Sequence, residues 1–166
     1  SFRFEIPSTF LLTDTKITVG RAHFMLTDRE LSSFAEKTES ILIEYFSMAN
    51  LIFEDTYEDP GIWLKEKYLK DLGKRFKERK IKFQTAESRR FRTHKMEIKQ
   101  ATAASGISSR KTALYTNATW YCPRTNRIYS VTASTSIRRP VVFKRESDRE
   151  AHKSLMEDFL SSFRCH

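Results

Sequence analysis

The sequence predicts an α+β fold, in which helices flank an antiparallel β-sheet within a single domain spanning residues 1–166. The first supporting observation is that 166 residues, 39% of them hydrophobic and 13 of them Phe, can bury a sizeable core. The second is a pair of β-rich runs joined by turn-forming residues between positions 111 and 136. The third is a pair of capping-box sequences, each followed by apolar residues at helical spacing.

The N-terminal region predicts two extended segments. Residues 2–7 alternate apolar and charged side chains before Pro7, which is typical of a short edge strand. Residues 16–26 form the second segment, in which Ile17 and Val19 supply β-branched side chains.

Two successive helices are expected next. Thr27 and Glu30 form a capping box, because the Thr hydroxyl can accept a hydrogen bond from the Glu30 backbone N–H while the Glu side chain reaches back. Apolar residues then recur at helical spacing, so the first helix is expected over residues 31–53. Pro60 at a first helical position predicts a second helix over residues 61–80.

Residues 111–136 predict a β-hairpin with its turn at Pro123–Asn126. A four-residue loop there pairs Cys122 with Arg127 and Trp120 with Tyr129. One face of the hairpin is apolar and is expected to face the core. The other face is rich in hydroxyl groups and carries two side chains that could stack on a ligand or partner, or lie under a helix: Tyr115 and Tyr121.

The remaining segments complete the α+β pattern. Residues 81–104 are expected to be extended, and residues 141–143 to form either a short strand or a packed tether. Ser147–Glu150 is a second capping box. It predicts a C-terminal helix whose apolar stripe consists of Ala151, Leu155, Met156, Phe159, Leu160 and Phe163.

Charge is unevenly distributed along a chain whose net charge is +9. Residues 64–100 hold 14 basic and 5 acidic side chains, whereas residues 1–63 are acidic on balance. This asymmetry indicates an anionic partner. The residues expected to bind that partner are Lys74, Arg75, Arg79, Lys80, Arg89, Arg90 and Arg92. The alternatives are a solvated face, or charges that protect an exposed strand edge from aggregation.

No catalytic motif is present, so no catalytic residue is assigned: the chain has no glycine-rich phosphate loop, paired-histidine motif or nucleophile elbow. The His and Cys residues lack the paired spacing of a zinc site, and adjacent Cys165 and His166 form a poor geometry for one tetrahedral ion. We therefore expect no metal and no other cofactor. A disulfide between Cys122 and Cys165 requires the C-terminal helix to end over the hairpin turn, and a cytosolic origin argues against it.

Residues 120–129, followed by a terminal helix that ends near Cys165, resemble the last part of PsbP-like domains. The opening Phe4–Pro7 is similar in style to the start of those domains. They include extrinsic subunits of the photosynthetic oxygen-evolving complex, and a Ran-binding nuclear import factor shares their fold. The resemblance implies an α/β/α sandwich and an adaptor-like domain without catalysis.

Together these observations predict a non-enzymatic binding or accessory domain that engages an acidic protein or another polyanion through its basic middle segment. Nucleic-acid binding is the first alternative, although the usual RNA- and DNA-binding fingerprints are absent. An enzyme with a dispersed active site is the second. No apolar run approaches the roughly 20 residues of a membrane-spanning helix. The oligomeric state and the compartment are left open, with the cytoplasm favoured.

Overall fold

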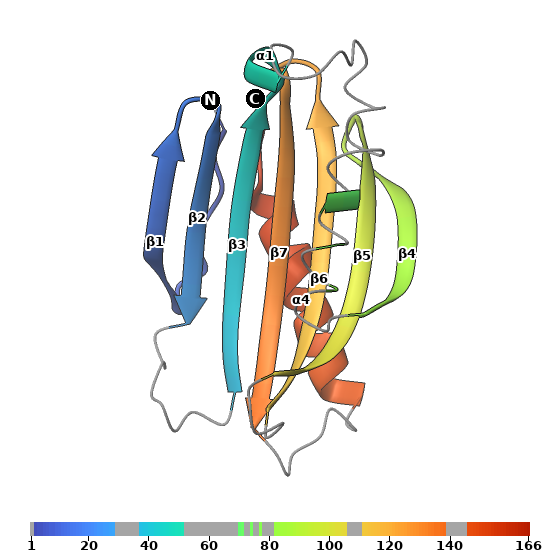
Figure 1. The fold of residues 1–166 in the computed structure, drawn as a ribbon. Coiled ribbons are helices and arrows are strands. Elements are labelled where there is room, and N and C mark those ends of the chain that lie inside the picture. The colour runs from blue at the N-terminus through green and yellow to red at the C-terminus, as the bar shows by residue number, and fades with distance from the viewer. Residues whose placement is uncertain are drawn as a thin grey trace.

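The structure, a computed structural model, describes residues 2–28, 37–51, 70, 71, 74, 77, 82–105, 111–138 and 146–166. These residues form a seven-stranded antiparallel sheet with the strand order β1-β2-β3-β7-β6-β5-β4. The strands are β1 (Phe10–Thr18), β2 (Arg21–Asp28), β3 (Lys37–Ser47), β4 (Lys82–Phe91), β5 (His94–Ser105), β6 (Lys111–Cys122) and β7 (Arg127–Arg138). The helices are α1 (Met48–Leu51) and α4 (Glu146–Ser162), and α4 crosses one face of the sheet over β6 and β7 (Figure 1).

The central hairpin β6–β7 confirms the predicted pairing. Cys122 pairs with Arg127 and Trp120 with Tyr129, and the same register continues along the whole hairpin. Asn126 closes the turn with φ 49°, a left-handed conformation that asparagine tolerates better than most residues. Trp120 and Tyr129 are fully buried in the core that the sheet shares with α4. The predicted core face is therefore correct.

The opposite face of this hairpin is polar, as predicted, but its middle is buried. Asn117 Nδ2 donates to Ser130 Oγ (2.9 Å) and to Thr132 Oγ1 (2.8 Å), while Asn117 Oδ1 accepts from Thr119 Oγ1 (2.9 Å). Buried polar groups cost free energy unless they are hydrogen-bonded, and these groups bind one another. The central strands thus have two buried faces, one apolar and one polar.

The expected helix at 31–53 is wrong for residues 37–47, which form strand β3; among the described residues of this range, Met48–Leu51 are helical. Residues 41–46 are apolar at nearly every position, so their pattern fits a helix and a strand equally well. Ile41 and Ile43 are both fully buried at the two-residue spacing of a strand, and β3 pairs with β2 on one side and β7 on the other. Pairing with both neighbours therefore makes this segment a strand and not a helix. Residues 29–36, 52 and 53 lie outside the described residues.

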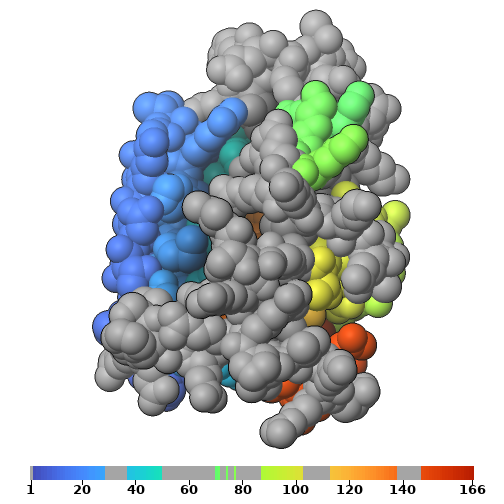
Figure 2. Space-filling view, turned by 60° about the horizontal axis from the view of Figure 1, so that its bottom comes forward, coloured from blue at the N-terminus to red at the C-terminus, as the bar shows by residue number. Residues whose placement is uncertain are grey.

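The segment expected to be one strand at 16–26 is instead a hairpin, because β1 and β2 are joined at Val19–Gly20. Gly20 has φ 77°, which the turn requires and glycine adopts without a steric penalty. β1 is an edge strand with almost all of its residues exposed, and β1 and β2 form one side of the surface in Figure 2 (blue). The predicted strand at 2–7 is reduced to an isolated bridge between Arg3 and Arg164.

Helix α4 confirms the predicted C-terminal helix, although it begins one residue before Ser147. Met156, Phe159 and Leu160 are buried against the sheet as expected, whereas Ala151 is exposed and His152 is buried in its place. The face of α4 that contacts the sheet is therefore rotated slightly from the predicted apolar stripe.

The predicted helix at 61–80 lies largely outside the described residues, as do residues 106–110 and 141–143. Lys70, Asp71, Lys74 and Lys77 are helical and exposed. The α/β/α sandwich stays a prediction, because the described residues place a long helix on one face of the sheet. Within the described part of the chain, no helix is both long and apolar enough to cross a membrane.

Candidate functional site

Three turns and both terminal segments meet at one end of the sheet, where Figure 1 marks the N- and C-termini. The Ser47 backbone N–H donates to the Gly20 carbonyl (2.6 Å), and the Met48 N–H donates to the Asn126 carbonyl (3.0 Å). Arg3 and Arg164 exchange two backbone hydrogen bonds of 2.8 Å each. We call this region the turn end and define it as Arg3, Val19–Arg21, Arg92–His94, Cys122–Asn126 and Arg164–His166.

An aromatic cluster fixes the C-terminal tail at the turn end. Phe163 is fully buried just beyond α4, stacked on Phe2 (5.8 Å between ring centroids) and on Phe4 (6.2 Å). Its ring also meets Trp120 edge to face at 5.2 Å. Aromatic pairs at these separations add to the free energy gained by burial. The burial of Phe163 therefore anchors the tail two residues before Cys165.

Four side chains with metal-binding atoms converge at the turn end: His94, Cys122, Cys165 and His166. Their ligand atoms all lie within 4.8 Å of one another, and all but His166 are buried. His94 Nε2 lies 3.1 Å from Cys165 Sγ, and His166 Nδ1 lies 3.4 Å from Cys165 Sγ and 3.5 Å from Cys122 Sγ.

This Cys–His cluster was not predicted from the sequence. Cys122 ends β6, His94 begins β5, and the tail runs past both, so the ligands come from three separate segments. The available signal was the position of Cys122 beside the predicted hairpin turn, with a terminal helix expected to end near it. The tail does end there, and both thiols are free rather than joined in a disulfide.

The surroundings of the cluster affect its two thiols in opposite directions. Burial by itself raises the pKa of the Cys122 thiol, but hydrogen bonds from the Thr125 side chain, from Cys165 and from the Thr125 and Arg124 backbone amides bring that pKa below its ordinary value. Burial, followed by the hydrogen bond and charge of Cys122, raises the pKa of the Cys165 thiol. Burial, followed by the charge of His166, lowers the pKa of His94 and favours its neutral, metal-binding form.

The predicted anion-binding residues are not all brought together. Arg89 is half-buried, and its Nη2 donates to both carboxylate oxygens of Glu157 in α4 (2.7 and 2.8 Å). Arg90 is exposed on β4, and Lys74 is an exposed helical residue. Arg92 is exposed at the turn end and donates to the Ser161 carbonyl (3.1 Å). The other three predicted residues lie outside the described part of the chain: Arg75, Arg79 and Lys80.

The turn end carries further basic side chains that were not predicted as a site. Arg3, Arg21, Arg92 and Arg124 are all exposed there. Its five segments contain no Asp or Glu. The charged side chains of these five segments are therefore all basic.

Tyr115 and Tyr121 lie on the polar face of β6, where the alternation of the strand places them with Asn117 and Thr119. Both are half-buried, and the Tyr121 hydroxyl donates to Asn126 Oδ1 (2.9 Å). Their role as a ligand-binding face stays a prediction.

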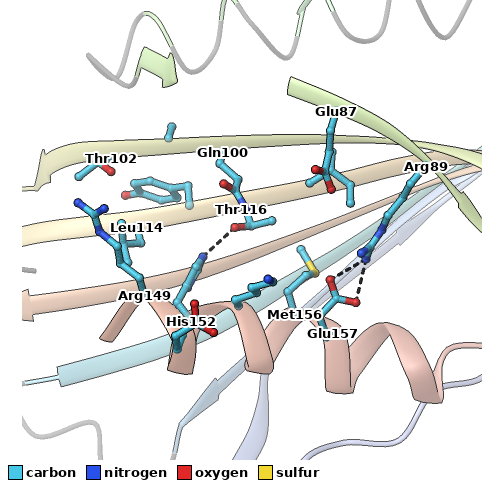
Figure 3. A pocket seen from close by; sticks show the side chains of 15 residues that line it. Glu87, Arg89, Gln100, Thr102, Leu114, Thr116, Arg149, His152, Met156 and Glu157 are labelled. Carbon is cyan, nitrogen blue, oxygen red and sulfur yellow. Dashed lines mark hydrogen bonds and ion pairs between the residues drawn. The ribbon is translucent and has the colours of Figure 1, made fainter. Parts of the chain in front are cut away.

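A groove of about 560 Å³ lies between α4 and strands β4, β5 and β6. Figure 3 shows that Arg89 and Glu157 meet at one end of the groove and that His152 bonds to Thr116. His152 Nε2 is 2.9 Å from Thr116 Oγ1, and its Nδ1 is 2.7 Å from Thr135 Oγ1.

The side chains of this groove best suited to proton transfer are already engaged. Burial, assisted by the charge of Lys37, lowers the pKa of His152 to about 4, and both ring nitrogens are hydrogen-bonded. Glu157 is paired with Arg89, a pair exposed enough to contribute no more than about 1 kcal/mol of stability. His152 and Glu157 are therefore poor candidates for a general base, which requires a free atom facing the substrate.

No protein-family model and no curated protein matches the chain. Several solved structures match it. LpqN from Mycobacterium tuberculosis, described as involved in cell envelope biogenesis, matches with a TM-score of 0.54 and 6% identity over 98% of this chain and 82% of LpqN.

The Ran-binding protein Mog1p from Saccharomyces cerevisiae matches with a TM-score of 0.50, and a mutant form of Mog1 with 0.51. Both are 12% identical and are matched over 98% of this chain and 89% of their own length. The fold is that of Mog1 and LpqN. This confirms the predicted PsbP-like resemblance at the level of the fold.

Proposed function

We propose that this chain is a non-enzymatic accessory domain that binds an acidic protein through its turn end. The observation that carries the proposal is the set of exposed arginines at the turn end, namely Arg3, Arg21, Arg92 and Arg124, on segments free of Asp and Glu. Arginine is enriched in protein interfaces, since it binds carboxylates with two parallel hydrogen bonds.

A structural neighbour supports binding rather than catalysis. Mog1p is described as a Ran-binding protein, so one solved protein with this fold acts by binding another protein. The groove beside α4 is consistent with this role, because both ring nitrogens of His152 are hydrogen-bonded and Glu157 is paired with Arg89.

The surface beside the arginines favours a protein partner over nucleic acid. Ile17 on β1 is 66% exposed, and Val19 in the adjoining turn, close to Arg21, is 91% exposed. An apolar surface beside arginine is typical of a protein interface. Single-stranded nucleic acid is instead bound by stacking on aromatic side chains. In the described part of the chain, the exposed large hydrophobic residues are all aliphatic.

The proposal is tested by removing the basic charge of the turn end. We expect the triple variant Arg21→Gln, Arg92→Gln, Arg124→Gln to lose most of the protein that the unaltered chain captures from host-cell lysate at low salt. The physical reason is that these arginines supply the attraction to an acidic surface, and raising the salt concentration should weaken capture by the unaltered chain.

The matched control removes three positive charges elsewhere: Lys16→Gln, Arg149→Gln, Lys153→Gln, all exposed. It should capture the same proteins as the unaltered chain. Equal capture by both triple variants would contradict the proposal. Capture abolished by nuclease treatment of the lysate would favour the nucleic-acid alternative.

A further inference from the structure

We propose that His94, Cys122, Cys165 and His166 bind one structural Zn²⁺ ion at the turn end. The inference is independent of the proposed protein partner, because it rests on the geometry of these four side chains. Two thiolate sulfurs and two imidazole nitrogens are a ligand set that zinc takes in structural sites.

The distances fit a tetrahedral ion. With the usual Zn–S and Zn–N bond lengths, a sulfur and a nitrogen ligand lie about 3.6 Å apart. The three distances between sulfur and nitrogen atoms given above are 3.1, 3.4 and 3.5 Å. All four ligand atoms lie within 4.8 Å of one another, so small side-chain movements suffice to complete the coordination.

The adjacency of Cys165 and His166 does not prevent joint coordination. His166 approaches the cluster through Nδ1, the ring nitrogen nearer to its own backbone. The tail is held in place by the backbone bridge between Arg3 and Arg164 and by the burial of Phe163. Two neighbouring residues therefore present a sulfur and a nitrogen to the same point.

Hydrogen-bond donors lie around the two sulfur atoms. The backbone amides of Thr125 and Arg124 form hydrogen bonds to the Cys122 sulfur. The Trp120 indole N–H is buried near Cys165 and has no hydrogen-bond partner among the described residues. Buried donors are nearly always satisfied in proteins, and a metal-bound thiolate is a stronger acceptor than a thiol. In metal sites, residues outside the coordination shell commonly form hydrogen bonds of this kind to the ligands.

The chemistry of the four ligands favours zinc, and it favours a structural site over a catalytic one. Two thiolates balance the charge of one Zn²⁺, so a neutral unit is buried. Protein side chains fill all four positions, whereas a catalytic zinc keeps one position for water or substrate. A disulfide would engage the two sulfurs alone and would leave both histidines unused. Bound zinc would join the β4–β5 turn, the β6–β7 turn and the C-terminal tail.

The test measures zinc in the 166-residue chain purified under reducing conditions. We expect one Zn²⁺ per chain by elemental analysis, and we expect Co²⁺ exchanged into the site to give the visible absorption of a tetrahedral thiolate complex. Removing the metal with a chelator should lower the melting temperature, because metal affinity adds to the stability of the folded state.

The decisive variant is His166→Ala, because His166 is exposed and its loss should leave the core intact. Its zinc affinity should fall by more than the 10- to 100-fold typical of losing an outer contact. Cys165→Ser should also weaken the sulfur-to-Co²⁺ charge-transfer absorption, because it leaves one thiolate ligand in place of two. The control is His23→Ala, which removes a half-buried histidine of β2 that is hydrogen-bonded to Asp14 (2.9 Å), and it should bind zinc normally.

Three results would overturn the inference. One is a chain with free thiols, no zinc and no change in melting temperature when Zn²⁺ is added. Another is zinc binding that His166→Ala and Cys165→Ser leave unchanged. A chain that carries a Cys122–Cys165 disulfide and takes up no zinc after reduction would likewise contradict it.

Discussion

Replacing Phe163 by alanine is expected to lower the free energy of unfolding by about 3–5 kcal/mol, the usual cost of truncating a buried aromatic side chain. Phe163 is fully buried and packs against Phe2, Phe4 and Trp120. Truncation leaves a cavity that these rigid rings cannot easily fill, and it also releases the tail that carries Cys165. Urea denaturation followed by fluorescence measures the change.

Two matched variants define the scale for this prediction. Phe163→Leu keeps most of the volume and should cost much less, about 1.5 kcal/mol or below. Leu12→Ala removes a side chain that is 50% exposed on β1 and should change stability by no more than about 0.5 kcal/mol. If Phe163→Ala were as mild as Leu12→Ala, the packing of the tail against the sheet would be wrong.

Acid should destabilise the fold through His152. Its pKa is about 4 in the folded protein and 6.5 for the unperturbed side chain, because burial and the charge of Lys37 disfavour the protonated ring. Between these two pH values the unfolded chain binds a proton that the folded chain does not, so the free energy of unfolding falls as the pH falls. The loss begins near pH 6.5, is complete below about pH 4, and amounts to roughly 3 kcal/mol.

The variant His152→Gln isolates this effect. Glutamine does not titrate and can still bond to the hydroxyls of Thr116 and Thr135. Since acid also protonates the ligands of the Cys–His cluster, the quantity to measure is the difference between the two proteins in urea denaturation from pH 4 to pH 8. That difference should shift in favour of the variant as the pH falls. Parallel pH profiles would show that folding does not lower the pKa of His152, and would contradict this account.

The second half of the fold was largely predictable from local sequence. The Pro123–Asn126 turn determines the register of β6 and β7, and alternation then assigns each residue to one face. The C-terminal helix was predictable because its apolar stripe has a single clear period. In both segments, local propensity and tertiary burial favour the same structure.

The N-terminal half was not predictable in the same way. Residues 41–46 are apolar on both faces, so their periodicity could not separate a helix from a strand, and pairing with β2 and β7 decided it. The Cys–His cluster depends on contacts between residues up to 72 positions apart, which spacing rules for local motifs do not detect. The charge pattern predicted an anionic partner. The ion pair between Arg89 and Glu157 shows that the sequence does not reveal which basic side chains remain free to bind such a partner.

The turn end can be tested directly as the binding surface by site-specific photo-crosslinking. A photoreactive residue is placed at position 124 in the 166-residue chain, or at position 153 in α4 as the control, and each protein is irradiated in host-cell lysate. We predict discrete protein adducts from position 124, sensitive to protease and resistant to nuclease, and few from position 153. Equal adducts from both positions, or none from position 124, would contradict binding through the turn end.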